Sequence, residues 1–290
     1  MQELYEQYKG LLYTLAYQLT GSSTDAEDIV HDVFLKICDV DLELLVEPKA
    51  YLCKMTTNRC LDFLKSARKK RERYFGEWLP EPIFTSNDES FEFVVRKELL
   101  FYSMLVLLER LSPLERAVFV LREAFGFEYC DIAEIIGKSE VNCRKVLSRA
   151  KGKIGITTEE QIHVEAASEE WVRQFIIALE QDNINTVVSM LAEDVVLVSD
   201  GGGKAVAAVH PIESRDLVTR FLLGLVRKTL FEEGSIQVAI REINGQTGVV
   251  VRTNVGIETV VLMHVERSSI RNLYFVRNPE KLKHLLNKLV

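Results

Sequence analysis

The chain has 290 residues, enough for two or three domains that each bury a core of their own. Its formal net charge is −7, yet its basic residues cluster in two short blocks, and such local charge decides which partners are attracted. The longest apolar run, Leu99 to Leu108, is too short for the roughly 20 residues of a membrane span, and no secretion signal is visible. We therefore expect a cytoplasmic protein with no membrane partner, and a buried helix at 99–108.

Residues 1 to about 73 predict helices, because glycine and strand-like alternation are almost absent there. One helix is expected from about Asp25 to Cys38, with Thr24 and Glu27 at the spacing of a capping box. Its apolar stripe leaves an outward face that contains Asp28, His31, Asp32 and Leu35. On these residues alone, a solvated acidic face is the simpler interpretation.

The next predicted helix carries the first basic block. From Lys54 to Arg73 there are eight basic and two acidic residues, a net charge of +6. Such a block attracts a polyanion such as DNA, and its lysine and arginine side chains can hold phosphates without reading sequence. Asn58 offers two donors and one acceptor, so it can read a base edge. A solvated basic helix end with a packing asparagine explains the same residues equally well.

A linker interrupts the helices after this block. Gly76 to Pro82 contains two prolines, and a polar run follows through Glu89, so a helix cannot continue. Helices are expected to resume near Ser90.

The second basic block lies in a helix-turn-helix pattern. Ser112-Pro113-Leu114-Glu115 predicts a capped helix start, and a shorter helix follows from Tyr129 to Ile136, with Gly137 as its left-handed end. Ser139 starts a third helix with a polar and basic outer face, and residues 138–153 carry a net charge of +5. The last helix of this motif enters the major groove of DNA. An ordinary helical hairpin is the alternative.

Beyond Gly155 the pattern becomes α+β. Helices are expected at 168–180, 183–192 and 279–289, and strands at 195–198, 235–243, 248–251, 257–265 and 270–276. The five cysteines show no CxxC spacing and lie mostly among apolar residues: Cys38, Cys53, Cys60, Cys130 and Cys143. We expect reduced core thiols, with no disulfide and no metal site.

Two segments of the first part, and the helix-turn-helix, resemble a known family. Asp25 to Leu35 resembles the region 2 helix of sigma-70-family transcription initiation factors, which binds the clamp of the RNA polymerase β′ subunit. Pro48 to Leu52, with Thr57 to Asp62 and the basic run after it, resembles the segment that recognises and melts the promoter −10 element. Ser112 to Ile154 resembles region 4, which reads the −35 element. The absence of other sigma regions between them implies the extracytoplasmic-function (ECF) group.

Three further motifs are similar to one ECF subgroup, which carries a fused SnoaL-like domain in place of a separate anti-sigma factor. They are Trp78-Leu79-Pro80-Glu81-Pro82, Asp200-Gly201-Gly202-Gly203-Lys204 and Asn278-Pro279-Glu280-Lys281-Leu282. The resemblance implies a multidomain fold: two all-α sigma modules, a region 2 bundle and a region 4 helix-turn-helix, followed by a cone-shaped α+β domain. The implied boundaries are 1–74 for region 2, 75–95 for the linker, 96–155 for region 4 and 156–290 for the SnoaL-like domain.

The resemblance also implies the functional residues. Polymerase would bind Asp28, Asp32 and Leu35; the −10 element would be held by Asn58, Arg59, Lys65, Arg68 and Lys69, with Asn58 reading a flipped, single-stranded base. The −35 element would be bound by Asn142, Arg144, Lys145, Ser148 and Arg149. A regulatory contact would join Trp78, Leu79 and Pro80 to Asp200, Gly201, Gly202, Gly203, Lys204, Asn278, Pro279 and Leu282, with Trp78 as a large apolar anchor.

The implied partners are core RNA polymerase, through its β′ clamp and β flap, and promoter DNA. A separate anti-sigma factor would not be required, and no cofactor or catalytic activity is expected. The alternative is a DNA-binding regulator whose last domain binds a small ligand or catalyses a reaction, because this fold also occurs in enzymes. Its acid-base candidates would be Asp200, His210, Arg252, His264 and Tyr274.

Overall fold

The computed structural model describes residues 2–38, 47–71, 73–85, 97–156, 166–231 and 236–286. These form two compact units that each combine separate stretches of the chain. The first unit contains residues 1–73 and 87–163, and the second contains residues 74–86 and 164–290. The first half of the linker expected at 75–95 therefore belongs to the same unit as the C-terminal domain.

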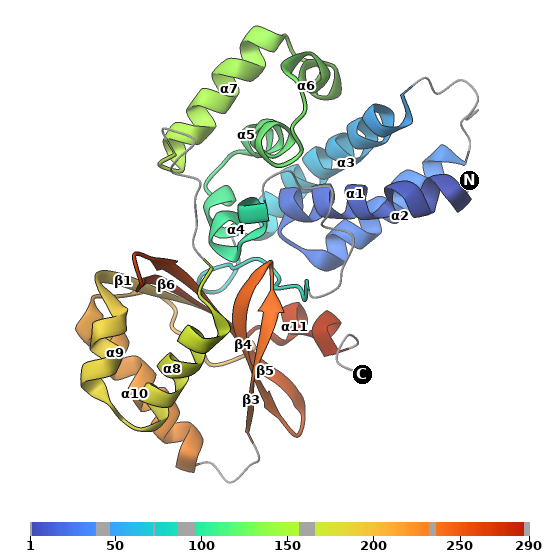
Figure 1. Ribbon diagram of the computed structural model, residues 1–290. Coiled ribbons are helices and arrows are strands. Elements are labelled where there is room, and N and C mark those ends of the chain that lie inside the picture. Colours follow the sequence, from blue (N-terminus) through green and yellow to red (C-terminus); the bar gives the residue numbers. More distant parts are fainter. Residues whose placement is uncertain are drawn as a thin grey trace. The chain divides into compact units, whose positions relative to one another are not determined.

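The first unit begins with a three-helix bundle. The helices are α1 (Gln2–Thr20), α2 (Ser23–Ile37) and α3 (Pro48–Arg71), and α1 packs against both of the others (Figure 1). The helix expected from Asp25 starts two residues earlier, because the cap is Ser22, whose hydroxyl accepts the backbone N–H of Asp25 at 3.1 Å. The prediction of a capping box at Thr24 was wrong. Ser22, Ser23 and Thr24 all have a hydroxyl that can cap a helix, so the sequence alone did not decide between them.

The rest of the first unit is also helical. After η3 (Lys97–Leu100) and α4 (Tyr102–Leu108) come α5 (Pro113–Phe119), the π-helical turn η4 (Val120–Ala124), α6 (Tyr129–Ile136) and α7 (Glu140–Lys153). The apolar run 99–108 is buried as expected except for the half-buried Val106 and Leu107, but it forms two short helices that break at Phe101. The capped start at Ser112 and the left-handed Gly137, with φ of 68°, are confirmed. Ile132 and Ile135 are the buried residues of α6.

The second unit is a mixed sheet with helices. Its elements are α8 (Glu169–Glu180), α9 (Ile184–Met190), β1 (Leu191–Asp200), β2 (Ile212–Glu213), α10 (Arg215–Phe231), β3 (Gln237–Ile243), β4 (Gln246–Thr253), β5 (Gly256–Glu266), β6 (Ser269–Val276) and α11 (Pro279–Leu286). The strand order is β2-β1-β6-β5-β4-β3, with β1 and β6 parallel and the other pairs antiparallel. The expected α+β class is confirmed, but the sequence analysis missed α10.

The two faces of this sheet are covered differently. One face carries an apolar core, to which Val249, Val261 and Met263 belong, beneath α8, α9 and α10 (Figure 1). Because side chains alternate along a strand, the buried Val250, Val260 and Leu262 point to the other face. There α11 packs against β5. The buried linker residues Leu79 and Ile83 belong to the same unit.

Two further expectations concern single features. Among the described residues, no helix is long and apolar enough to cross a membrane. All five cysteines are free thiols, and Cys53, Cys60 and Cys143 are buried as expected. Cys38 and Cys130 are exposed, so the prediction of core positions was wrong for these two, which lie at helix ends.

Candidate functional site

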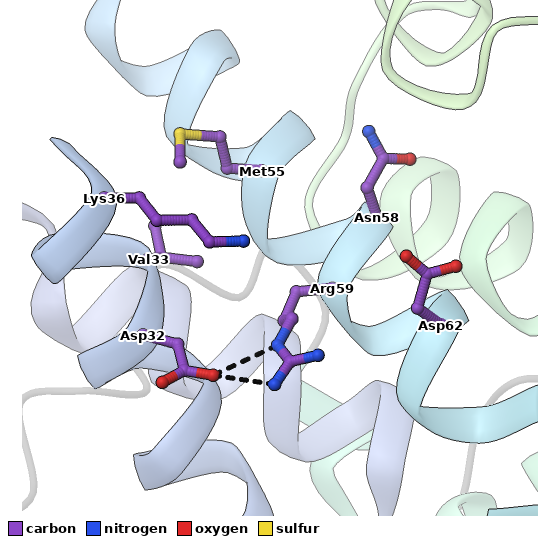
Figure 2. Close-up of a pocket in the computed structure, with 7 residues that line it drawn as sticks. All are labelled: Asp32, Val33, Lys36, Met55, Asn58, Arg59 and Asp62. Carbon is purple, nitrogen blue, oxygen red and sulfur yellow. Dashed lines mark hydrogen bonds and ion pairs between the residues drawn. The ribbon is translucent and has the colours of Figure 1, made fainter. Parts of the chain in front are cut away.

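Helices α2 and α3 of the first unit form a pocket of about 280 Å³. Its lining comes from Asp32, Val33 and Lys36 on α2 and from Met55, Asn58, Arg59 and Asp62 on α3 (Figure 2). Arg59 donates from Nε and Nη2 to Oδ2 of Asp32, at 3.1 and 2.8 Å. The residue expected to touch polymerase is thus paired with one expected to touch DNA. Asn58 lies across the pocket from this pair.

The outward face of α2 has the expected composition. Asp28 and Leu35 are exposed, and Leu35 has 56% of its surface accessible although its neighbours on this face are polar. On α3, Lys65 binds Asp62 at 2.8 Å, and this hydrogen bond lowers the pKa of the Asp62 carboxyl. The side chains of Arg68 and Lys69 lie outside the described residues.

Helix α7 presents the basic face that the helix-turn-helix pattern predicts. Ser139 caps it, and Cys143, Val146, Leu147 and Ala150 form its buried stripe. Lys145, Ser148 and Arg149 are exposed, and Asn142 is half-buried. Arg144 lies 4.0 Å from the ring centroid of Tyr129 on α6 and 3.6 Å from a carboxylate oxygen of Glu140. Arg144 thus contacts Tyr129 and Glu140 but keeps 59% of its side chain exposed, and Lys145, Ser148 and Arg149 also face outward.

Two glutamates fix the C-terminal end of α7. Lys153 binds Glu115 at 2.7 Å, and Lys151 binds Glu123 at 2.9 Å, with both carboxylates buried. Burial acts to raise the pKa of Glu115, but hydrogen bonds from Lys153 and Ser112 outweigh it and lower the pKa to about 2. The capping glutamate of α5 thus also orients the candidate recognition helix, a role that the capping-box pattern did not indicate.

The helix-turn-helix also packs against the three-helix bundle. Arg116 on α5 is 3% exposed and donates to the carbonyl oxygens of Leu19 and Leu108, each at 2.9 Å, and to Glu109 at 2.6 Å. Helix α6 lies along α3, with Lys54 and Glu134 separated by 3.7 Å. The sequence analysis missed Arg116, because an arginine inside a capped helix gives no sign that its guanidinium is buried.

The second unit contains a buried polar network that involves the linker. Asp200 is fully buried, and its carboxylate accepts three hydrogen bonds: from the Tyr74 hydroxyl at 2.6 Å, from Leu79 N–H at 2.9 Å and from Lys281 Nζ at 2.6 Å. Lys281 also donates to the Leu79 carbonyl, and its ammonium lies 4.0 Å from the Trp78 ring centroid. The buried anchor is Leu79, at 1% exposure, rather than Trp78, whose indole covers the lysine.

The glycines of the 200–204 loop allow the close approach of this network. Gly202 has φ of +58°, and a Cβ there would lie 2.3 Å from Asn278 Nδ2 and 2.8 Å from the Tyr74 hydroxyl. A Cβ at Gly201 would lie 2.2 Å from the carbonyl oxygen of Ala205. Neither position accepts a side chain without a shift of the backbone or of the network.

A second anchor holds the end of the linker segment. Asn244, in the turn between β3 and β4, donates its N–H to the Ile83 carbonyl at 2.9 Å and accepts the Ile83 N–H at 3.2 Å. Phe84 forms an antiparallel bridge with Ile243, and the Thr85 hydroxyl donates to Glu242 at 2.9 Å. The Asn244-Gly245 pair is a hairpin-turn signal, but nothing in the sequence indicates that the turn binds a distant segment.

The acid-base candidates lie in different surroundings. Asp200 belongs to the linker network, His210 is exposed, and His264 is hydrogen-bonded to Asn272 at 3.1 Å. Lys204 pairs with Glu280 at the surface. Among the described residues, no group of three or more His, Cys, Asp and Glu side chains is placed to hold a metal ion.

Comparison with known proteins agrees with this arrangement. The sigma-70 region 2 model matches residues 4–70, and the sigma-70 region 4 model matches residues 102–154. ECF RNA polymerase sigma factor SigJ of Mycobacterium tuberculosis is 33% identical over 96% of this chain and 91% of its own length. The probable ECF RNA polymerase sigma factor SigI of that species is 27% identical over 97% of this chain and 94% of its own.

The crystal structure of the M. tuberculosis extracytoplasmic function sigma factor SigJ superposes with a TM-score of 0.80 at 29% identity, and 98% of each chain is covered. The match includes the C-terminal sheet domain as well as both helical modules. The expected order of region 2, region 4 and a SnoaL-like domain is thereby confirmed. The chain therefore belongs to the ECF group of the sigma-70 family, the RNA polymerase sigma factors that direct promoter-specific transcription initiation.

Proposed function

We propose that the outward face of α2 binds the β′ clamp of core RNA polymerase, and that region 4 also engages the β flap. Leu35 carries this proposal, because a 56% exposed leucine one turn after Asp32 provides an apolar anchor beside charged residues. Leu35→Ala should weaken binding of the full-length protein to core polymerase. Leu217→Ala is the matched control, since Leu217 is a 51% exposed leucine of α10 in the second unit. Equal binding by both variants and the wild-type protein would contradict the assignment.

For DNA, we infer that α3 binds the −10 element and α7 the −35 element. The pocket beside Asn58 supports base reading on α3, because an extruded base needs a cavity and a polar edge to bind. Arg59, Lys65, Arg68 and Lys69 would contact the backbone, as would Arg149 and Ser148 on α7, next to Asn142 and Lys145 at the bases. The confinement of Arg144 by Tyr129 supports a phosphate contact from the edge of the groove rather than a base contact.

We further propose that the C-terminal domain controls initiation through the linker, without a separate anti-sigma factor. The supporting observation is the Asp200 network, which joins Tyr74 and Leu79 of the linker to Lys281 of α11. At about 3.4 Å per extended residue, release of residues 74–85 would add up to about 40 Å to the connection between regions 2 and 4. Docking of the linker therefore limits how far the two DNA-binding modules can separate.

Separation of the modules would also break the buried contacts of Arg116. In the first unit this guanidinium joins α5 of region 4 to the end of α1 in region 2. A promoter that binds both modules at a set spacing competes with this packing. The packed state is thus the inactive one in our proposal, and linker docking favours it.

Run-off transcription with core polymerase tests the proposal. Start sites are first identified with the full-length protein on genomic fragments, and Trp78→Ala is then compared with the wild-type protein on one promoter. Trp78→Ala removes the ring over Lys281, weakens linker docking and should raise the transcript yield while both DNA-binding modules remain folded. Val255→Ala, at a 97% exposed side chain of the second unit, is a control outside the linker contact. An unchanged yield for Trp78→Ala would count against control through the linker.

A further inference from the structure

One apolar side chain on the outward face of α7 takes no part in the packing of the helix-turn-helix. Val141 is the second residue of α7 and is 62% exposed. Packing of the helix is carried by the buried stripe from Cys143 to Ala150. A β-branched residue is a weaker helix former than alanine, so its presence at this position does not serve the stability of the helix.

The position of Val141 places it with the candidate DNA-binding residues. Residues at i, i+4 and i+7 share one face of a helix, so Val141 lies in line with Lys145 and Ser148. The N-terminal residues of a recognition helix are those that reach base edges in the major groove. Single exposed apolar residues are common on protein surfaces, but this one lies where α7 would meet the bases.

The chemistry of the major groove identifies what such a side chain can recognise. The C5-methyl group of thymine is the apolar group that the bases present there, and aliphatic side chains contact it. Glu140, which precedes Val141, is paired with Arg144, and Arg144 is held over Tyr129. Arg144 thus has partners within the module, whereas the exposed side chains of Val141 and Lys145 lie together on the outward face of α7.

We propose that Val141 contacts a thymine methyl group in the −35 element and selects thymine over cytosine at that position. This inference rests on the proposed placement of α7 in the major groove. Removal of the methyl group should lower affinity about fourfold, the ratio that corresponds to about 0.8 kcal/mol for one buried methyl or methylene group. Valine would thus supply base selectivity that the polar residues of α7 do not provide.

The test replaces thymine with deoxyuridine, which differs by that methyl group alone. A promoter is first obtained by run-off transcription with core polymerase and the full-length protein. Each thymine of its −35 element is then replaced singly, on either strand, and holoenzyme affinity is measured for the wild-type protein, Val141→Ala and Val255→Ala. Val255 is a matched control, because it is 97% exposed and lies in the second unit. Lys145→Ala reports separately on whether α7 binds the element.

The expected result is a loss of about fourfold at one thymine with the wild-type protein and Val255→Ala, and no loss there with Val141→Ala. An element without thymine, no deoxyuridine effect at any position, or an equal effect in Val141→Ala would each overturn the inference. If Lys145→Ala still weakens binding in those cases, the −35 role of α7 stands without the thymine contact. If neither substitution on α7 changes affinity, both the inference and the −35 role fail.

Discussion

Replacement of Lys281 by methionine would leave Asp200 as a buried carboxylate without its cation. The side chains of Lys281 and Asp200 are 7% and 0% exposed, so water can screen neither charge. Methionine retains most of the aliphatic length of lysine, and the change is therefore electrostatic more than steric. Removal of one partner from a buried ion pair costs about 3–5 kcal/mol, because the remaining charge stays desolvated. We expect the free energy of unfolding of the second unit to fall by at least about 3 kcal/mol.

Tryptophan fluorescence isolates this unit, because both tryptophans of the chain, Trp78 and Trp171, belong to it. For a urea m-value of about 2 kcal/mol/M, the unfolding midpoint should shift down by roughly 1.5 M. Lys204→Met is the matched control: Lys204 also pairs with a carboxylate of this domain, Glu280, but both side chains are more than half exposed. Exposed ion pairs contribute little to stability, so the control midpoint should stay close to that of the wild-type protein.

A second substitution distinguishes the charge from the packing. In the double variant Asp200→Asn with Lys281→Met, no unpaired charge remains, so part of the lost stability should return. Equal midpoints for Lys281→Met and Lys204→Met would refute the assignment of Asp200 and Lys281 as the central pair of the linker site. If the double variant loses more free energy of unfolding than the two single variants lose together, the electrostatic explanation is refuted.

Three further outcomes follow from the structure. Gly202→Ala should lower the urea midpoint of the second unit, because the new Cβ would overlap Asn278 and the Tyr74 hydroxyl. Gly224→Ala, in α10, has open space around its Cβ and should leave the midpoint unchanged or raise it. Equal midpoints for the two variants would contradict the close approach of Gly202 to Asn278 and Tyr74. In the native protein, iodoacetamide should label the exposed Cys38 and Cys130 and spare the buried Cys53, Cys60 and Cys143, as mass spectrometry would show. Burial raises the pKa of Cys53 to about 12, and it also raises the pKa of Cys60 and of Cys143, so few of these thiols are reactive thiolates. The pKa of Glu115 falls from 4.5 to about 2 on folding, so its carboxylate stabilises the first unit above pH 4.5 and loses that effect as the pH falls toward 2. Glu115→Gln should therefore flatten the decline of the melting temperature, followed by circular dichroism of the helices, between pH 4.5 and 2. An identical slope in the variant and the wild-type protein would contradict the pairing of Glu115 with Lys153.

The sequence was informative wherever local chemistry determines structure. Ser112 with Glu115, Gly137 and Ser139 fixed the ends of the region 4 helices, because capping depends on residues three or four apart. The missed helix α10 has a different cause. Arg215 to Phe231 contains a glycine and several β-branched residues, and it is kept helical by packing against β1, α8 and α9. Tertiary packing of this kind overrides local propensity and has no local signal.

The functional residues divide in the same way. The DNA-binding candidates on α3 and α7 could be found from the sequence, because basic residues at helical spacing, opposite an apolar stripe, predict a solvent-facing basic surface. Arg116, Asn244 and Thr85 could not, because their partners lie far away in sequence and each side chain is ordinary in its local context. Tyr74 was missed for the same reason: it precedes the recognised linker motif and still supplies a hydrogen bond to Asp200.

These long-range contacts bear on how the C-terminal domain should be tested. Leu79, Ile83 and Phe84 belong to the second unit and are 1%, 2% and 8% exposed, so deletion of residues 164–290 would expose large apolar side chains in the linker. Full burial of each is worth about 1.5–3 kcal/mol, and such a linker would bind other apolar surfaces or promote aggregation. If such a truncated protein failed to support transcription, the cause could be the exposed linker as well as the loss of the regulatory domain. Lys281→Met and Trp78→Ala are the sharper tests, because they loosen the linker while the sheet that covers Ile83 and Phe84 is retained.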